Sequence, residues 1–111
     1  MPYKVVVRFC IPGFHRWPEA PDECDYLRSL HHHFFKYKVE LSVPHGRRAV
    51  EVHWLRNLCV SLAEGETVVV TKSCEQLAER LAVQLLQNFP HSKVAVEVWE
   101  DQYVGARYES E

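Results

Sequence analysis

Apolar and polar residues alternate strictly between residues 31 and 43 of this chain. The odd positions carry His31, His33, Phe35, Tyr37, Val39, Leu41 and Val43, and the even positions carry His32, Phe34, Lys36, Lys38, Glu40 and Ser42. Successive side chains of a β-strand point to opposite faces, so this alternation predicts one long strand with an apolar face and a mostly polar face. His31 and His33 should therefore project together, at one end of the face that enters the core, while His32 points away.

Shorter patterns predict the remaining elements. They are, in chain order, a strand at 3–10, a long Pro-rich surface loop at 12–29, a helix at 52–63, a connection at 64–72, a helix beginning at Ser73, and strands at 93–99 and 102–108. The second helix has the clearest signal, because Ser73 and Gln76 form a capping box and an apolar stripe ends at Pro90. The order ββ–αα–ββ predicts an α+β fold, with a four-stranded antiparallel sheet and two helices on one face.

Composition limits the classes of function. The 111 residues are enough for one domain over 1–111 with a modest core. A net charge of −2 gives no basic surface, so neither a nucleic acid nor a membrane is expected as a partner. No apolar run is long enough to span a bilayer, and the first ten residues, MPYKVVVRFC, have no signal-peptide pattern. The four cysteines form no CxxC pair, which favours free thiols and a cytoplasmic location.

Three histidines are candidates for a metal site. His31 and His33 share one face of the predicted strand, where two imidazoles can bind one cation. His15 lies upstream, in the loop that leads back toward the same end of the sheet. A catalytic zinc site typically has three protein ligands and one open position. The alternative is that these are ordinary strand-end histidines, because an HxH pair alone is weak evidence for a metal.

Short motifs along nearly the whole chain carry a family resemblance. In order, they are FHRW at 14–17, Cys24, LHHH at 30–33, VEVHWLR at 50–56, SCEQLA at 73–78, VAVEVWED at 94–101 and ARY at 106–108. In this order they resemble the 6-pyruvoyl-tetrahydropterin synthase and 6-carboxy-tetrahydropterin synthase family, which has the tunnelling fold. The resemblance agrees with the ββ–αα–ββ order predicted from the residues themselves.

The resemblance implies a role for each matching residue. His15, His31 and His33 would bind Zn²⁺, which would polarise the side-chain hydroxyls of a dihydropterin triphosphate. Glu100 would accept two parallel N–H groups from the guanidine-like edge of a pterin, or of a purine-like ligand. Without the resemblance, Glu100 would be interpreted as a solvated acid at a strand end. Cys24 would be the thiolate base, with a pKa lowered by the nearby metal and histidines.

Two departures from the family pattern concern catalysis. Cys24 precedes His31 by seven positions, whereas about four separate the equivalent residues in the family. Family enzymes also carry an Asp-His pair between the two helices as a proton relay, but this chain has no aspartate between Asp25 and Asp101. The histidine nearest to that segment is His53, at the start of the first helix. It is either a substitute in the relay or an ordinary surface histidine.

Three functions remain open at this point. The first is a divergent zinc-dependent lyase of the pterin synthase type, with Cys24 and His53 as catalytic residues. The second is a non-catalytic module that keeps the metal and a pterin or purine-like pocket. The third is a purely structural oligomer, with a structural zinc or without metal, in which the histidines take no part in chemistry. In each case the open edges of a four-stranded sheet require protection, and the resemblance implies a homo-oligomer, trimer-based or hexameric, with ligand pockets at subunit interfaces. Glu100 and the histidines could then come from different subunits.

Overall fold

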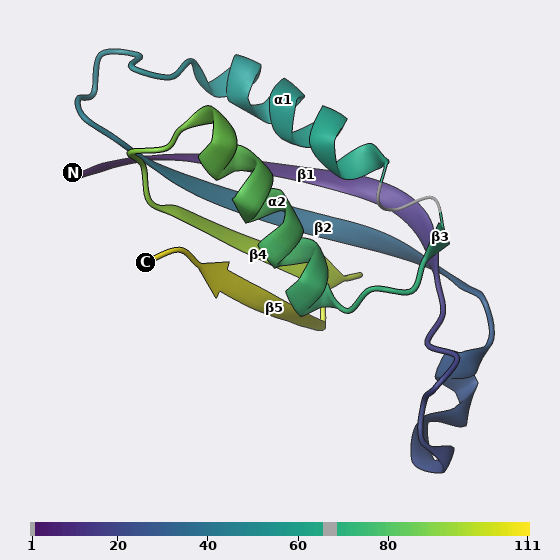
Figure 1. Cartoon of the computed structure of the whole chain (residues 1–111). Helices are drawn as coiled ribbons and strands as arrows, with labels where there is room; N and C mark the ends of the chain where they lie inside the picture. Colours follow the sequence, from purple (N-terminus) through teal and green to yellow (C-terminus); the bar gives the residue numbers. More distant parts are fainter. Residues whose placement is uncertain (1, 66–68) are drawn as a thin grey trace.

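The computed structural model describes residues 2–65 and 69–111 of the chain. Its elements are, in chain order, β1 (Tyr3–His15), the 3-10 helix η1 (Asp22–Arg28), β2 (His31–Val43), α1 (Val52–Glu64), β3 (Val69–Val70), α2 (Cys74–Asn88), β4 (Val94–Glu100) and β5 (Val104–Glu109). The strands form one sheet in the order β3–β1–β2–β4–β5. Strands β1, β2, β4 and β5 pair antiparallel, and both α-helices cover the same face (Figure 1). The predicted α+β fold is confirmed.

The core lies between this face of the sheet and the two helices. Three inward residues of β2, Phe35, Val39 and Leu41, are 0% exposed. They meet the apolar stripe of α2, whose buried members are Cys74, Leu77, Ala78, Leu81, Ala82 and Leu85. Helix α2 begins where the sequence predicted, because the Ser73 hydroxyl accepts from the backbone N–H of Gln76 and the Gln76 side chain accepts from that of Ser73. The two-residue period of β2 and the helical period of α2 therefore bury the apolar residues that the sequence pattern indicated.

Strand β1 extends to His15, whereas the sequence predicted a strand that ends at residue 10. Pro12 and Gly13 indicated a loop, but both residues pair with β2, and His15 lies opposite His31. Proline is tolerated because, within the described residues, the other edge of β1 is paired only near its end, by β3. The extension places His15 in the sheet itself rather than in a loop above it.

Strand β3 is a second difference from the prediction. It contains two residues and pairs parallel to β1 at Phe14 and His15. The sequence predicted only a connection over 64–72, of which residues 66–68 lie outside the described part of the chain. Strand β3 returns the chain to the His15 end of the sheet directly before α2.

Residues 16–30 form an arm that projects beyond this end of the sheet (Figure 1). The sequence predicted a surface loop, and the structure adds η1 within it. The backbone N–H of Trp17 donates to the carbonyl of Leu27 at 2.7 Å, and Arg28 Nε donates to the carbonyl of Ala20 at 2.8 Å. These bonds close the arm on itself.

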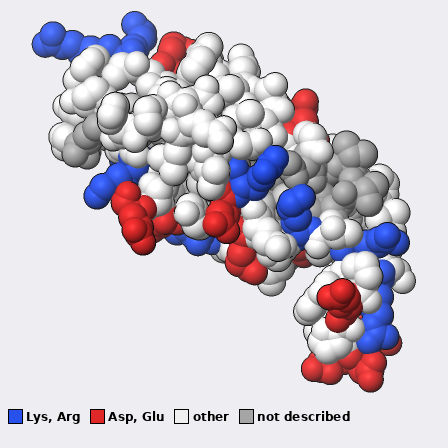
Figure 2. All heavy atoms as spheres, viewed as in Figure 1, with Lys and Arg blue, Asp and Glu red and all other residues white. Residues whose placement is uncertain are grey.

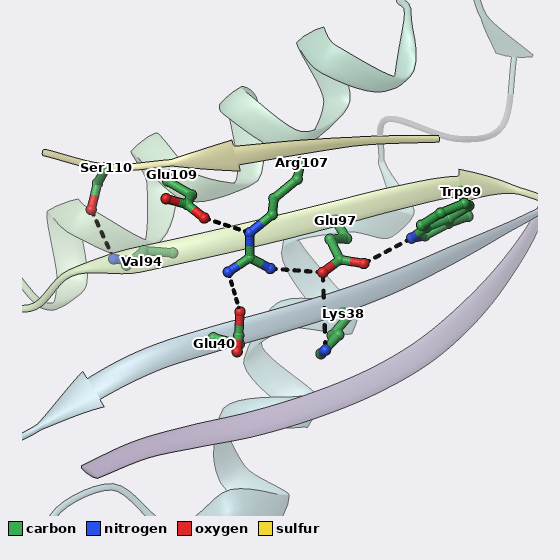
Figure 3. A network of polar contacts seen from close by, with 8 residues as sticks. All are labelled: Lys38, Glu40, Val94, Glu97, Trp99, Arg107, Glu109 and Ser110. Carbon is green, nitrogen blue, oxygen red and sulfur yellow. Dashed lines mark hydrogen bonds and ion pairs between the residues drawn. The ribbon is translucent and has the colours of Figure 1, made fainter. Parts of the chain in front are cut away.

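The other face of the sheet is polar. Arg107 of β5 donates to Glu97 of β4, to Glu40 of β2 and to Glu109 of its own strand (Figure 3). Glu97 also accepts from the indole N–H of Trp99 at 3.0 Å, a bond that lowers the pKa of the Glu97 carboxyl. The network joins three strands where no helix covers them.

Charges of both signs are interspersed over the face seen in Figure 2. This distribution agrees with the net charge of −2 and gives no large basic region on that face. Within residues 2–65 and 69–111, no helix is both long and apolar enough to cross a bilayer.

Gly105 has a specific packing role, because it lies opposite Trp99 in the β4–β5 pair. A Cβ at Gly105 would clash with the carbonyl oxygen of Val98 and would lie 2.9 Å from the Cα of Trp99. We expect Gly105→Ala to lower the free energy of unfolding by about 1–3 kcal/mol, because backbone atoms must move. Gly65→Ala is the matched control: among the described residues nothing lies within 4 Å of its Cβ position, so we expect no loss. Urea denaturation of both variants tests this, and equal stability would contradict it.

Candidate metal centre

The structure brings His15, His31 and His33 together at one end of the sheet. One ring nitrogen of each lies within 4.8 Å of those of the other two. His15 and His31 are direct partners in the β1–β2 register, and His33 is two residues along the same face of β2. His15 is only 7% exposed. The strand alternation and the extension of β1 together account for the cluster.

The outer nitrogens of two of these rings have partners that fix their tautomers. His31 Nδ1 lies 2.8 Å from the carbonyl oxygen of Ser29, and His33 Nδ1 lies 2.9 Å from Asp101 Oδ2. A carbonyl and an ionised carboxylate can only accept hydrogen bonds, so each Nδ1 must carry the proton. In the neutral rings, both Nε2 atoms then keep a lone pair. Metal-bound histidines in proteins are oriented by outer partners of this kind.

One pair of the inner nitrogens has the spacing of two ligands on a tetrahedral metal ion. His15 Nδ1 and His31 Nε2 are 3.3 Å apart, close to the edge of about 3.3–3.4 Å expected between two nitrogens bound to tetrahedral zinc. His33 Nε2 is buried and has no hydrogen-bond partner in the described structure. Buried polar atoms are rarely left unpaired. A cation shared by the three nitrogens would remove this deficit, so the three histidines can hold a metal ion.

Glu100, the last residue of β4, adds a carboxylate to the cluster. Its Oε1 lies 3.5 Å from His15 Nδ1, and its Oε2 lies 3.6 Å from His33 Nε2. The β2–β4 register, which places Glu100 opposite Phe35, sets this position. One chain therefore brings together the three histidines and Glu100, without a residue from a second subunit.

Asp101 is a residue of the centre that the sequence analysis missed. Its carboxylate contacts His33 and also accepts from the backbone N–H of Phe34 at 3.1 Å. These two hydrogen bonds hold the pKa of the Asp101 carboxyl below its usual value, and the bond from Phe34 has the larger effect. Only the register of β4 on β2 brings Asp101 to His33, and no local motif encodes that register. Its position directly after Glu100 was the one available signal.

A pocket of about 440 Å³ opens beside the cluster. Its lining includes His15, Glu100, Trp17 and Leu27 from the arm, and Cys74 at the start of α2. Burial and the carboxylates of Glu100 and Glu75 raise the pKa of the Cys74 thiol to about 12. Nothing in the sequence places the start of α2 beside Glu100, so Cys74 could not be predicted as a residue of this pocket. This thiol is protonated at neutral pH and serves there as a hydrogen-bonding group.

The structure does not bring Cys24 to the metal cluster within one chain. It lies in η1 on the projecting arm and is not among the residues that line the pocket. Its backbone N–H donates to the carbonyl of Pro21 at 2.8 Å. The role of Cys24 as a base remains a prediction.

His53 lies at the opposite end of the molecule from the cluster. The residues just before it, Glu51 and Val52, line a pocket with Tyr3 and Val43. That end of the β1–β2 pair is twelve residues along β1 from the pair of His15 with His31, or about 40 Å at the rise of a β-strand. The side chain of His53 is exposed, as expected for a histidine on the surface of a helix. Its role in a proton relay also remains a prediction.

Comparisons with known proteins support the fold alone. No family model matches the chain, and no curated protein matches it. Among solved structures, the chain is similar to the crystal structure of an uncharacterized protein from Wolinella succinogenes. The two share 20% sequence identity, with a TM-score of 0.69 over 98% of each chain. This protein therefore shares its whole architecture with that neighbour.

The burial of His15 predicts how the metal-free protein responds to pH. Burial lowers the pKa of His15 below 6.5, against the opposing effect of the Glu100 carboxylate. The unfolded state then binds the proton more tightly than the folded state. The stabilising contribution of the neutral, buried His15 is present above about pH 6.5 and is lost as the pH falls through the pKa of His15 in the folded protein. We expect the free energy of unfolding, measured with a chelator present, to fall between pH 7.5 and 5.5.

Two variants test whether the burial of His15 causes this pH dependence of stability. His15→Gln should flatten the pH profile, whereas His53→Gln, at the exposed and distant histidine, should leave the profile as steep as in the wild type. Both are measured by urea denaturation at several pH values. Identical profiles for the wild type and His15→Gln would show that burial of His15 is not the cause.

Proposed function

We propose that this protein is a divergent zinc-dependent lyase of the 6-pyruvoyl- and 6-carboxy-tetrahydropterin synthase type, acting on a dihydropterin triphosphate. The observation that supports the proposal is the position of Glu100, within 3.6 Å of His33 and on the wall of the adjoining pocket. A metal site and a carboxylate for ligand recognition thus share one cavity. The motif order that resembles this family gives the proposal its substrate class.

His15, His31 and His33 would hold the zinc ion and leave one position open. When bound there, zinc supplies a Lewis acid that polarises an oxygen of the ligand. Asp101 and the carbonyl of Ser29 hold two of the imidazoles in the tautomer that binding requires. The β1–β2 pairing holds the three ligands in register, and the β2–β4 pairing begins two residues beyond His33, at Phe35.

Glu100 would bind the guanidine-like edge of the ligand. A carboxylate accepts two parallel N–H donors from such an edge, which fixes both orientation and identity. The pocket, at about 440 Å³, lies within the range of about 300–1,000 Å³ for small-molecule sites. Trp17, which lines the pocket, offers a flat aromatic surface to a planar heterocycle.

A second candidate function is a metal-containing module that binds a pterin or purine-like ligand without converting it. The positions of Cys24 and His53 favour this candidate, because neither residue lies at the cluster within one chain. Cys74 does line the pocket, but its thiol is protonated at neutral pH. A lyase would therefore require assembly into a homo-oligomer, trimer-based or hexameric, in which another copy supplies the acid–base groups. The four unpaired thiols suit the reducing cytoplasm.

Zinc content tests the metal site. We expect about one zinc per chain in untagged wild-type protein and a loss of most of it in His33→Ala. His32→Ala is the matched control, because His32 is an exposed neighbour on the other face of the same strand. Elemental analysis after dialysis measures both. A wild-type protein that takes up no zinc, or equal losses in the two variants, would contradict the site.

Ligand binding and turnover separate the two candidate functions. We expect Glu100→Gln to weaken the binding of dihydroneopterin triphosphate about 10- to 100-fold, because a charge-assisted pair contributes about 1.5–3 kcal/mol. Glu97→Gln, on the opposite face of β4, should bind like the wild type. Release of triphosphate by the zinc-loaded protein supports the lyase. Tight binding without release supports the module, and equal binding by all three proteins would remove Glu100 from the site.

A further inference from the structure

We propose that Asp101 is a positioning residue of the metal centre, which holds His33 in the tautomer that binds metal and fixes the adjacent Glu100 beside it. This inference rests on the proposed zinc site and deepens it. It concerns how the site is set before any metal or ligand arrives.

The carboxylate of Asp101 divides its two oxygens between consecutive residues of β2. Oδ2 lies 2.9 Å from His33 Nδ1, and Oδ1 lies 3.1 Å from the backbone nitrogen of Phe34. Both partners are N–H donors, so the arrangement requires two acceptor oxygens on one side chain. A carboxylate has two, whereas an amide has one. The pairing with His33 Nδ1 leaves the lone pair on Nε2, the buried nitrogen that has no hydrogen-bond partner among the described residues.

The backbone of Asp101 supports the same interpretation. Its φ angle is 57°, in the left-handed region that few residues other than glycine, asparagine and aspartate occupy. Backbone conformations of this kind persist where the surroundings hold them and are common at functional sites. Here the backbone N–H of Asp101 donates to the carbonyl of Phe34 at 2.8 Å, and the carboxylate returns to the N–H of the same residue. The left-handed turn thereby directs the side chain back onto β2.

These two hydrogen bonds to Phe34 also fix the position of Glu100. They close β4 onto β2 immediately after Glu100, which pairs with Phe35 in the same register. The Glu100 carboxylate is thus held within 3.6 Å of His33 by the turn that also orients His33. One aspartate therefore couples the geometry of the metal ligand to that of the ligand-binding carboxylate.

Two substitutions separate the carboxylate from the backbone turn. Asp101→Asn tolerates the left-handed φ and keeps one oxygen for the N–H of Phe34, but it has no second acceptor for His33. Asp101→Gly suits the φ angle best and removes the side chain. Asp25→Asn is the matched control, since Asp25 is exposed on η1, away from the pocket. All four proteins are compared as full-length chains.

The first measurement is zinc affinity, by competition with a chromophoric chelator. We expect Asp101→Asn and Asp101→Gly to bind zinc about 10- to 100-fold more weakly than the wild type, the usual effect of removing an outer partner of a metal-bound histidine. Asp25→Asn should bind like the wild type. The second measurement is the tautomer of His33 in the metal-free protein, by ¹⁵N NMR. We expect the Nδ1–H form in the wild type and a mixture of tautomers in both Asp101 variants.

The outcomes are distinct. A wild-type protein that binds no zinc would overturn the proposed site, but not the tautomer prediction, which is measured without metal. Wild-type affinity in both Asp101 variants, with His33 still in the Nδ1–H form, would overturn the role of Asp101. Weaker zinc binding with an unchanged tautomer would also overturn it, since the loss would then arise from the turn alone.

Discussion

The register between β1 and β2 is the constraint on which the rest of the site depends. The two strands pair along their whole length, and the last pair is His15 with His31. Side chains alternate between faces with a period of two, so a slip of one residue would turn His15 away from His31 and His33. The same β2 strand sets the register of β4 and thus the position of Glu100. The central strand therefore positions both halves of the site, and its buried residues hold that register through the core.

This constraint concentrates polar groups at one end of an apolar core. Phe35, which is 0% exposed, lies directly beside the histidines on the same face of β2. Three imidazoles, the Glu100 carboxylate and the more exposed Asp101 carboxylate meet at this end of the core and require compensation, which the outer nitrogens of His31 and His33 obtain from neighbouring acceptors. Among the inner nitrogens, His15 Nδ1 and His31 Nε2 face each other at 3.3 Å, and His33 Nε2 has no hydrogen-bond partner in the described part of the chain. A divalent cation would pair with the lone pairs and offset both negative charges, so the chemistry of the whole donor set, rather than any one histidine, points to a metal.

The sequence predicted the parts of this arrangement that follow from local periodicity. Alternation in β2 placed His31 and His33 on the inward face, and the capping box placed the start of α2. What the sequence could not predict depends on pairing between distant segments. Proline and glycine near the end of β1 indicated a loop, yet the edge position of that strand tolerates both. Asp101 reaches His33 only through the β2–β4 register. The distance of His53 from the cluster follows from the direction in which α1 runs along the sheet, and no local sequence pattern predicts that direction.

Metal binding and acid–base chemistry make different demands on this fold. Metal binding requires groups fixed relative to one another within a few tenths of an ångström, and paired strands of one chain supply all of them. The groups that could move protons in the proposed reaction, Cys24 and His53, lie instead on the projecting arm and at the start of α1. Zinc affinity should therefore be independent of protein concentration, because one chain completes the site. Any turnover that uses Cys24 or His53 of a second copy should rise with assembly of the chains.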